Sequence, residues 1–213
     1  MSVTIDIDLR GQLGEARDQG PRPTCLVFAV SAAHEASRGA SEYLSPEVLF
    51  YSGAQRSHRD PSLGLTQTAV RDALQHDGQP LEGAWKYLPA TPGVLAWKPP
   101  TLAEPTHKAP LSFAPRSIPE IRQVLERRVP VLLVVALTVA MYTPDQHSVV
   151  RARPGDTMTT GRHALLAVGC GHADDGGYIL VRNSWGPTWG DAGHGWIHEP
   201  YLMPQLETTG IIA

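Results

Sequence analysis

The stretch 178–197, YILVRNSWGPTWGDAGHGWI, decides how this chain folds. Its first part is rich in β-branched and apolar residues and predicts a strand over 177–184, and a further strand is expected at 194–199. The tetrapeptide DDGG just upstream is a strong hairpin signal, so the strand predicted at 163–170 should pair with the first one. Asn183 ends the first strand and is the only asparagine among the 213 residues.

Outward from this stretch, the chain has helices first and strands later, which favours an α+β protein of one domain. Residues 1–88 should be mainly helical and residues 117–213 mainly β. The apolar run 129–142 is too short to cross a membrane, and its β-branched content predicts a buried strand over 131–139. Seven prolines within 89–116 indicate a surface connector between the two lobes rather than a packed element. Helices are predicted at 25–39 after Thr24, at 46–51 after Ser45, at 65–75, and at 118–128 after the capping box of Ser117 and Glu120.

Composition excludes several classes of protein and site. With 42% apolar and 18% charged residues the chain is globular, and a net charge of −3 gives no sign of nucleic-acid binding. Cys25 and Cys170 are the only cysteines, so a disulfide framework and a cysteine-based zinc site are excluded, and a reducing compartment is expected. Cys170, between two glycines, is expected to be structural. His194 and His198 lie in a stretch unsuited to a helix, so we expect neither a metal ion nor a cofactor.

Three segments carry residues suited to nucleophilic catalysis. Cys25 stands at the start of a helix, where the helix dipole favours the thiolate. His163 can take up the thiol proton and give it to a leaving amine, while Asn183 can accept the other ring N–H and fix the tautomer. The Gln19 amide can stabilise an oxyanion together with the Cys25 N–H. Trp185 can shield the hydrogen bond between His163 and Asn183 from water.

In this arrangement the chain resembles a papain-like (C1-type) cysteine peptidase. Gln19 lies six residues before Cys25 in QGPRPTC, Phe28 follows three residues after it, and the separations to His163 (138 residues) and Asn183 (158 residues) are close to the family's. The segment NSWGPTWGDAGHGWI reproduces the family pattern N-S-W-G-x-x-W-G-x-x-G. The resemblance covers essentially the whole chain. It implies a two-lobed fold with Cys25 and His163 facing each other across a cleft, and hydrolysis of protein or peptide substrates through a thioester acyl-enzyme.

Four further residues are expected to contact the substrate. Gly64 and Leu65 fall where the resemblance places the substrate groove, although Gly64 could equally be an ordinary turn glycine. Arg162 precedes His163 where the family often has Asn or Asp, and a charge pointing inward there would disfavour the imidazolium. Trp185 is the fourth.

The chain also departs from the family around the nucleophile. Arg22 replaces a cysteine that pairs in secreted members, Pro23 removes a backbone donor, and Leu26 replaces the usual aromatic residue. Pro23 and Leu26 keep open the alternative of a catalytically silent binding module. A second alternative is an amidase or transferase that uses the same machinery on isopeptide or other amide bonds.

The N-terminus predicts how the enzyme is restrained and where it acts. Its acidic start has no apolar core of signal-peptide length, and because Cys25 is only 25 residues from the start we expect no pro-segment. We therefore expect a separate inhibitor or immunity-like protein as partner, with no membrane or nucleic-acid partner. The expected location is the cytoplasm, or another cell after export of the protein as an effector toxin by a dedicated secretion system. Fifteen arginines against three lysines are a composition typical of bacteria.

Overall fold

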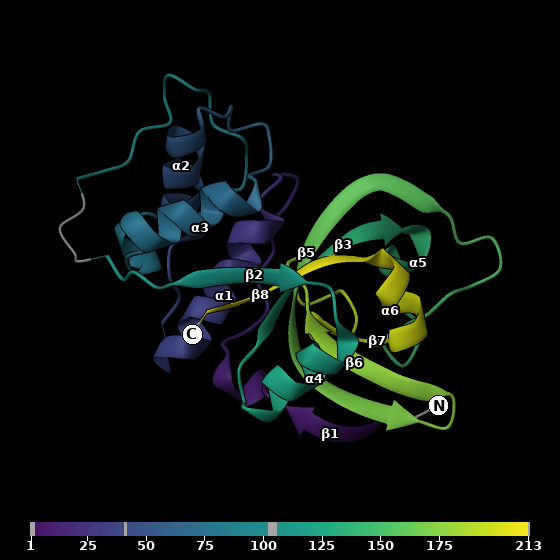
Figure 1. The fold of residues 1–213 in the computed structure, drawn as a ribbon. Coiled ribbons are helices and arrows are strands. Elements are labelled where there is room, and N and C mark those ends of the chain that lie inside the picture. The colour runs from purple at the N-terminus through teal and green to yellow at the C-terminus, as the bar shows by residue number, and fades with distance from the viewer. Residues whose placement is uncertain (1–2, 41, 102–105, 213) are drawn as a thin grey trace.

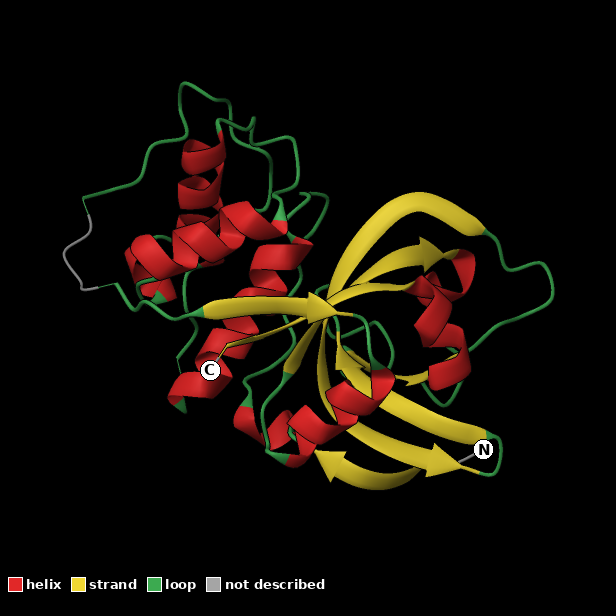
Figure 2. Cartoon of the chain, in the orientation of Figure 1, coloured by secondary structure: helices red, strands yellow, loops and turns green. Residues whose placement is uncertain are grey.

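The computed structural model describes residues 3–40, 42–101 and 106–212. Figure 1 shows the first three helices gathered on one side of the molecule and a strongly curved sheet on the other. Figure 2 shows the same division between helix and strand, with two strands of the sheet reaching across to the helical side. The expected α+β arrangement of a helical lobe beside a β lobe is confirmed.

Side-chain caps begin two helices of the first lobe, the predicted one at Ser45 and one at Thr66 that the sequence did not indicate. Ser45 Oγ accepts the Val48 N–H (3.2 Å), and Thr66 Oγ1 accepts the Ala69 N–H (3.2 Å). The second helix is longer than predicted and ends at residue 57 rather than 51, because it continues through Gly53, where a Cβ would lie only 2.5 Å from the Leu65 side chain. The helices of this lobe are α1 (Cys25–Arg38), α2 (Pro46–Ser57) and α3 (Gln67–His76), and the 3-10 turns η1 (Arg10–Gln12) and η2 (Glu82–Ala84) flank them.

The β lobe is built on one mostly antiparallel sheet in the order β2-β8-β3-β5-β6-β7-β4, with β1 paired to β5 outside this path. The predicted DDGG hairpin is present, because Ala173 lies opposite Gly176 where β5 turns into β6. The strands are β1 (Thr4–Asp8), β2 (Leu111–Pro115), β3 (Val131–Thr138), β4 (Val149–Val150), β5 (Met158–Ala173), β6 (Gly176–Arg182), β7 (His194–His198) and β8 (Leu206–Ile212).

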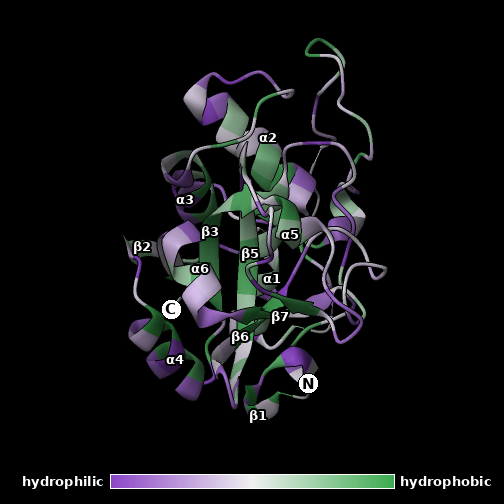
Figure 3. Ribbon diagram, turned by 90° about the vertical axis from the view of Figure 1, so that its right-hand side faces the viewer, coloured by the Kyte–Doolittle hydropathy of each residue, from purple (hydrophilic) through white to green (hydrophobic). Residues whose placement is uncertain are grey.

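Apolar residues concentrate where the sheet meets α1. Figure 3 shows strands β3 and β5 as strongly hydrophobic bands through the middle of the molecule. Leu133, Leu165 and Val168 on these strands are fully buried, and Val30 of α1 joins the same core. Burial on this scale contributes about 25 cal/mol per Å² of apolar surface removed from water. The core therefore holds the nucleophile helix against the strand that carries His163.

The prediction of a surface connector over 89–116 is wrong in part. Residues 111–115 form β2, which pairs with β8, and Trp97 is buried with its indole N–H donated to Glu47 (2.7 Å). Pro115 is tolerated within β2 because β2 is the edge strand of the sheet. Residues 102–105 of the predicted connector lie outside the described residues.

The C-terminal half contains elements beyond those predicted. The apolar run 129–142 forms β3 as expected but ends in the short helix α5 (Val139–Tyr142). Strands β4 and β8 and helix α6 (Glu199–Gln205) were not predicted from the sequence. Strand β1, within the stretch 1–88 that was expected to be mainly helical, was not predicted either, and it joins the β lobe by pairing with β5. Helix α4 (Ile118–Glu126) is present, with Ser117 Oγ accepting the Glu120 N–H (3.3 Å). Among the described residues, no helix combines the length and apolar character that crossing a membrane requires.

Candidate active site

The nucleophile candidate Cys25 is the first residue of α1, at the positive end of the helix dipole. Thr24 occupies the predicted N-cap position, but its hydroxyl pairs with the Tyr87 hydroxyl (2.8 Å) rather than capping the helix. The Cys25 thiol also interacts with the backbone N–H of Ala164, the residue directly after His163. The sequence-predicted nucleophile and histidine are therefore brought together across the two lobes.

His163 lies within β5, and Asn183 follows the end of β6. His163 Nε2 and Asn183 Oδ1 are 2.7 Å apart, and both side chains are buried. The Ser184 N–H donates to the same Oδ1 (2.8 Å). Because a backbone N–H can only donate, the Asn183 atom that meets it must be the oxygen, and His163 must then carry its proton on Nε2. This leaves the lone pair on Nδ1.

An aromatic layer covers this hydrogen bond. The Trp185 ring lies 4.5 Å from the His163 ring between centroids, tilted by 33°. Tyr142 stacks on Trp185 at 5.0 Å with the rings almost parallel (6°). The expectation that Trp185 shields the pair agrees with this geometry. Trp185 was also predicted to contact the substrate. It lines a neighbouring pocket with Tyr142 and Trp189, however, and not the cleft that contains Cys25.

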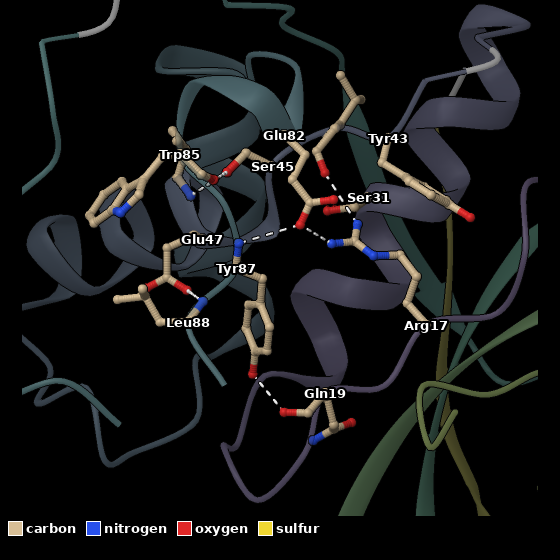
Figure 4. Close-up of polar contacts among 12 residues, drawn as sticks. Arg17, Gln19, Ser31, Tyr43, Ser45, Glu47, Glu82, Trp85, Tyr87 and Leu88 are labelled. Carbon is tan, nitrogen blue, oxygen red and sulfur yellow. Dashed lines mark hydrogen bonds and ion pairs between the residues drawn. The ribbon is translucent and has the colours of Figure 1, made fainter. Parts of the chain in front are cut away.

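The orientation of the Gln19 carboxamide is fixed from both ends. Gln19 Nε2 donates to the carbonyl of Arg22 (2.8 Å), and the Ser184 hydroxyl donates to Gln19 Oε1 (2.7 Å). A carbonyl can only accept, so the amide nitrogen is assigned by its partner. Figure 4 shows Tyr87 reaching the main chain of Gln19, whose carbonyl accepts the Tyr87 hydroxyl (2.6 Å). The second N–H of the Gln19 amide is left for a substrate oxygen in the cleft that Gln19 lines.

Burial sets the protonation states of Cys25 and His163. It raises the pKa of the Cys25 thiol, against the opposing effect of the N–H groups of Ala164, Leu26 and Cys25 itself. It lowers the pKa of His163 to about 4, against the opposing effect of the hydrogen bond to Asn183. Both shifts favour a neutral thiol beside a neutral imidazole, whereas the sequence led us to expect an ion pair. His163 is therefore available as a base at neutral pH.

The cleft between the lobes has a volume of about 750 Å³ and includes Cys25 and His163 in its lining. Of the predicted substrate contacts, Gly64, Leu65 and Arg162 also line it. Arg162 is 70% exposed and pairs with Glu207 (2.8 Å), so its charge is turned away from the imidazole toward a carboxylate. Residues that the sequence did not indicate complete the lining, among them Arg59, Gln67, Val134 and Glu207.

The departures around the nucleophile have structural consequences. Arg22 is fully buried and forms an ion pair with Glu47 (2.5 Å), which replaces the covalent link expected of secreted members. Pro23 and Leu26 both line the cleft. Cys170 is buried on β5, where a structural role was expected. Among residues 3–40, 42–101 and 106–212, no group of three or more His, Cys, Asp or Glu side chains is arranged to hold a metal ion.

Comparisons with known proteins agree with this geometry. The model of the papain family of cysteine proteases matches residues 4–202. The chain is 25% identical over 201 residues to cysteine proteinase COT44 of Brassica napus, covering 90% of this chain and 58% of that protein. It spans about half the length of the curated relatives that it matches along most of its own length.

Solved structures show the same fold. Xylellain, a cysteine protease from Xylella fastidiosa, superposes with a TM-score of 0.81 at 20% identity, covering 99% of this chain and 86% of that one. The Carica candamarcensis cysteine protease CMS1MS2, in complex with E-64, superposes with a TM-score of 0.76 at 22% identity, covering 97% of both chains. The two-lobed fold expected from the sequence is thereby confirmed.

Proposed function

Since the chain belongs to the papain family of cysteine proteases, we propose that it hydrolyses peptide bonds through a thioester acyl-enzyme formed on Cys25. The observation that carries the proposal is the double hydrogen bond to Asn183 Oδ1, from His163 Nε2 and from the Ser184 N–H. This arrangement supports a role for the Nδ1 lone pair of His163 as the general base toward the thiol.

In the acylation step, Cys25 Sγ attacks the carbonyl carbon of the scissile bond while its proton passes to His163 Nδ1. The transient imidazolium is stabilised by its Nε2–H bond to Asn183. The oxyanion accepts hydrogen bonds from the Gln19 amide and the Cys25 N–H, and each such donor is worth about 2.7–4 kcal/mol in the transition state. When the tetrahedral intermediate collapses, the C–N bond breaks and His163 gives its proton to the leaving amine.

In the deacylation step, water takes the place of the amine. His163, neutral again, removes a proton from the water as it attacks the thioester carbonyl. Collapse breaks the C–S bond, releases the carboxylic acid and returns the proton to the Cys25 sulfur. The Gln19 amide and the Cys25 N–H stabilise the oxyanion in both steps, so their loss should slow both.

The test is cleavage of a fluorogenic peptide library by the wild-type protein and by Cys25→Ala and His163→Ala. We expect cleavage by the wild type alone, and a mass increase on Cys25 equal to the acyl group when the reaction is quenched early. Transfer of the acyl group to an added amine in preference to water would favour the transferase alternative. Retention of peptide binding without any acylated Cys25 would favour the silent binding module and contradict the proposal.

Restraint of the enzyme by a separate inhibitor protein, and its role as an effector toxin, also belong to this proposal. An open cleft that includes Cys25 and His163 is the surface that such an inhibitor would fill. Co-purification of Cys25→Ala from the native host should recover one stoichiometric protein partner that blocks cleavage by the wild type. A wild-type enzyme that is active and harmless when expressed alone would count against both roles.

A further inference from the structure

Arg59 is held at the rim of the cleft by the end of helix α2. His58 adopts a left-handed backbone conformation (φ 50°), and the Arg59 N–H then bonds back to the Ala54 carbonyl (3.0 Å). This is the pattern of a Schellman motif, which fixes the backbone directly after a helix. The Arg59 side chain is therefore anchored at its base, and it lines the same cleft as Cys25 and His163.

The Arg59 guanidinium has a buried nitrogen without a partner. Its Nε is shielded from solvent and has no hydrogen-bond acceptor among the described residues. Within that part of the chain it also forms no ion pair, unlike the exposed Arg56 three residues earlier, which pairs with Asp77 (2.5 Å). A buried donor without an acceptor costs free energy, so a ligand that supplies the acceptor is stabilising at this position.

The acid next to Arg59 in the chain and the acid that shares its cleft are both engaged elsewhere. Asp60, its neighbour in the chain, accepts the N–H (2.8 Å) and hydroxyl (2.6 Å) of Ser62 within its own turn. Glu207, which lines the same cleft, is held by Arg162 (2.8 Å). The positive charge of Arg59 is therefore not neutralised by either carboxylate, and the charged side chains that line the cleft sum to a net positive charge.

We propose that Arg59 binds an Asp or Glu side chain of the peptide substrate, so that acidic peptides are preferred. The inference rests on the proposed function, because it assigns the ligand to a peptide held beside Cys25. A guanidinium suits this role because its planar N–H groups match the two oxygens of a carboxylate. Because the site is partly desolvated, this contact discriminates between a carboxylate and the uncharged amide of the same shape.

The experiment compares matched peptides in which Glu is placed at each position around the cleaved bond, with Gln at the same position as the partner. For the wild type we expect kcat/KM to favour Glu over Gln by about tenfold or more at one position, as for a charge-assisted hydrogen bond. In Arg59→Gln this ratio should fall to about one. In Arg59→Glu the preference should invert toward a Lys peptide. Arg56→Gln, in the last turn of α2, is the matched control and should keep the wild-type ratio.

The same peptides are also measured by calorimetric binding to Cys25→Ala, so that recognition is read without cleavage. If the Glu peptide binds more tightly through Arg59 but no peptide is cleaved, the proposed function fails and the inference stands. If peptides are cleaved and the Glu-to-Gln ratio is about one at every position, or is unchanged in Arg59→Gln, the inference is overturned and the proposed function stands.

Discussion

Ser184 controls the orientation of two catalytic side chains at once. Its N–H holds the Asn183 oxygen toward His163, and its hydroxyl holds the Gln19 oxygen so that the amide nitrogen is available to the cleft. The sequence indicated Gln19, His163 and Asn183 as the machinery because their residue types and order are specific. It did not single out Ser184 for a role, because the contact with Gln19 spans 165 positions and exists only in the folded chain.

Ser184→Ala removes the hydroxyl bond and keeps the N–H bond. We expect kcat to fall by about 2- to 10-fold with little change in KM, because one neutral hydrogen bond contributes about 0.5–1.5 kcal/mol and here it acts on the oxyanion donor. Steady-state kinetics on a good peptide substrate measures both constants. A fall that lies wholly in KM would show that Ser184 acts on substrate binding instead of on Gln19.

Glu35 lines a small pocket together with Asn183, and its carboxyl group makes the stability of the fold depend on pH. Burial raises the pKa of its carboxyl group to about 7 from 4.5, against the opposing effects of the Leu44 N–H and the charges of Arg17 and Arg182. The folded protein therefore binds this proton more tightly than the unfolded chain does. The contribution of Glu35 to stability is complete below pH 4.5 and is lost as the pH rises to about 7.

Glu35→Gln should remove this pH dependence. The variant keeps an acceptor for the Leu44 N–H (2.8 Å) and cannot ionise. Between pH 5 and 8, its free energy of unfolding should gain about 2.5 kcal/mol relative to the wild type, because the pKa of the wild-type carboxyl group is about 7 in the folded protein and near 4.5 in the unfolded chain. Urea unfolding at pH 5 and pH 8 measures this gain, with Glu42→Gln at an exposed site as the control. Equal pH dependence in wild type and Glu35→Gln would refute the assignment.

At the scale of elements, a buried ion pair links Arg22, in the loop just before Cys25, to Glu47 of α2. Arg22 contacts Glu47 at 2.5 and 3.1 Å and the Leu88 carbonyl at 2.6 Å, with both charged side chains fully buried. Glu47 also accepts the Trp97 indole N–H and the Leu88 N–H (3.1 Å), as Figure 4 shows for Leu88. The segment expected to be a loose connector is thereby pinned to the helical lobe.

Arg22→Ala leaves the Glu47 carboxylate buried without its counter-ion. We expect the free energy of unfolding to fall by about 3–5 kcal/mol, as for other broken buried pairs. Denaturant unfolding measures it, and Arg56→Ala, which breaks the exposed pair with Asp77, should cost at most about 1 kcal/mol. A loss for Arg22→Ala as small as for Arg56→Ala would contradict the role of the pair.

The elements that sequence analysis predicted are those with strong local signals. Helices α2, α3 and α4 each begin at a Ser or Thr cap, and the β5–β6 hairpin carries a turn sequence. The elements it missed depend on long-range pairing. Strand β2 contains Pro115, which an edge strand tolerates, and β8 contains Gly210, so neither resembles a strand until it is paired with the other.

At the scale of the whole molecule, the site depends on the contacts between the two lobes. The Gln19 N–H donates to the Ser184 carbonyl (2.8 Å), and Asp18 forms a β-bridge with Trp185, so the segment before the nucleophile is joined to the loop after Asn183. A further contact joins α3 to β8, where the Gln67 amide donates to the Thr208 hydroxyl (2.5 Å). The order of residues in the sequence predicted that the lobes meet, but the contacts that align them could be found only in the structure.

The central claim is that the contacts between the lobes place the Cys25 thiol where His163 activates it. The rate of Cys25 alkylation by iodoacetamide from pH 3 to 9, read by peptide mass spectrometry with buried Cys170 as internal control, tests it most directly. We expect rapid labelling of Cys25 with an acidic limb near pH 4, where His163 gains its proton, and loss of that limb in His163→Ala. Labelling that rises only above about pH 8, alike in wild type and His163→Ala, would show an ordinary thiol and contradict the account.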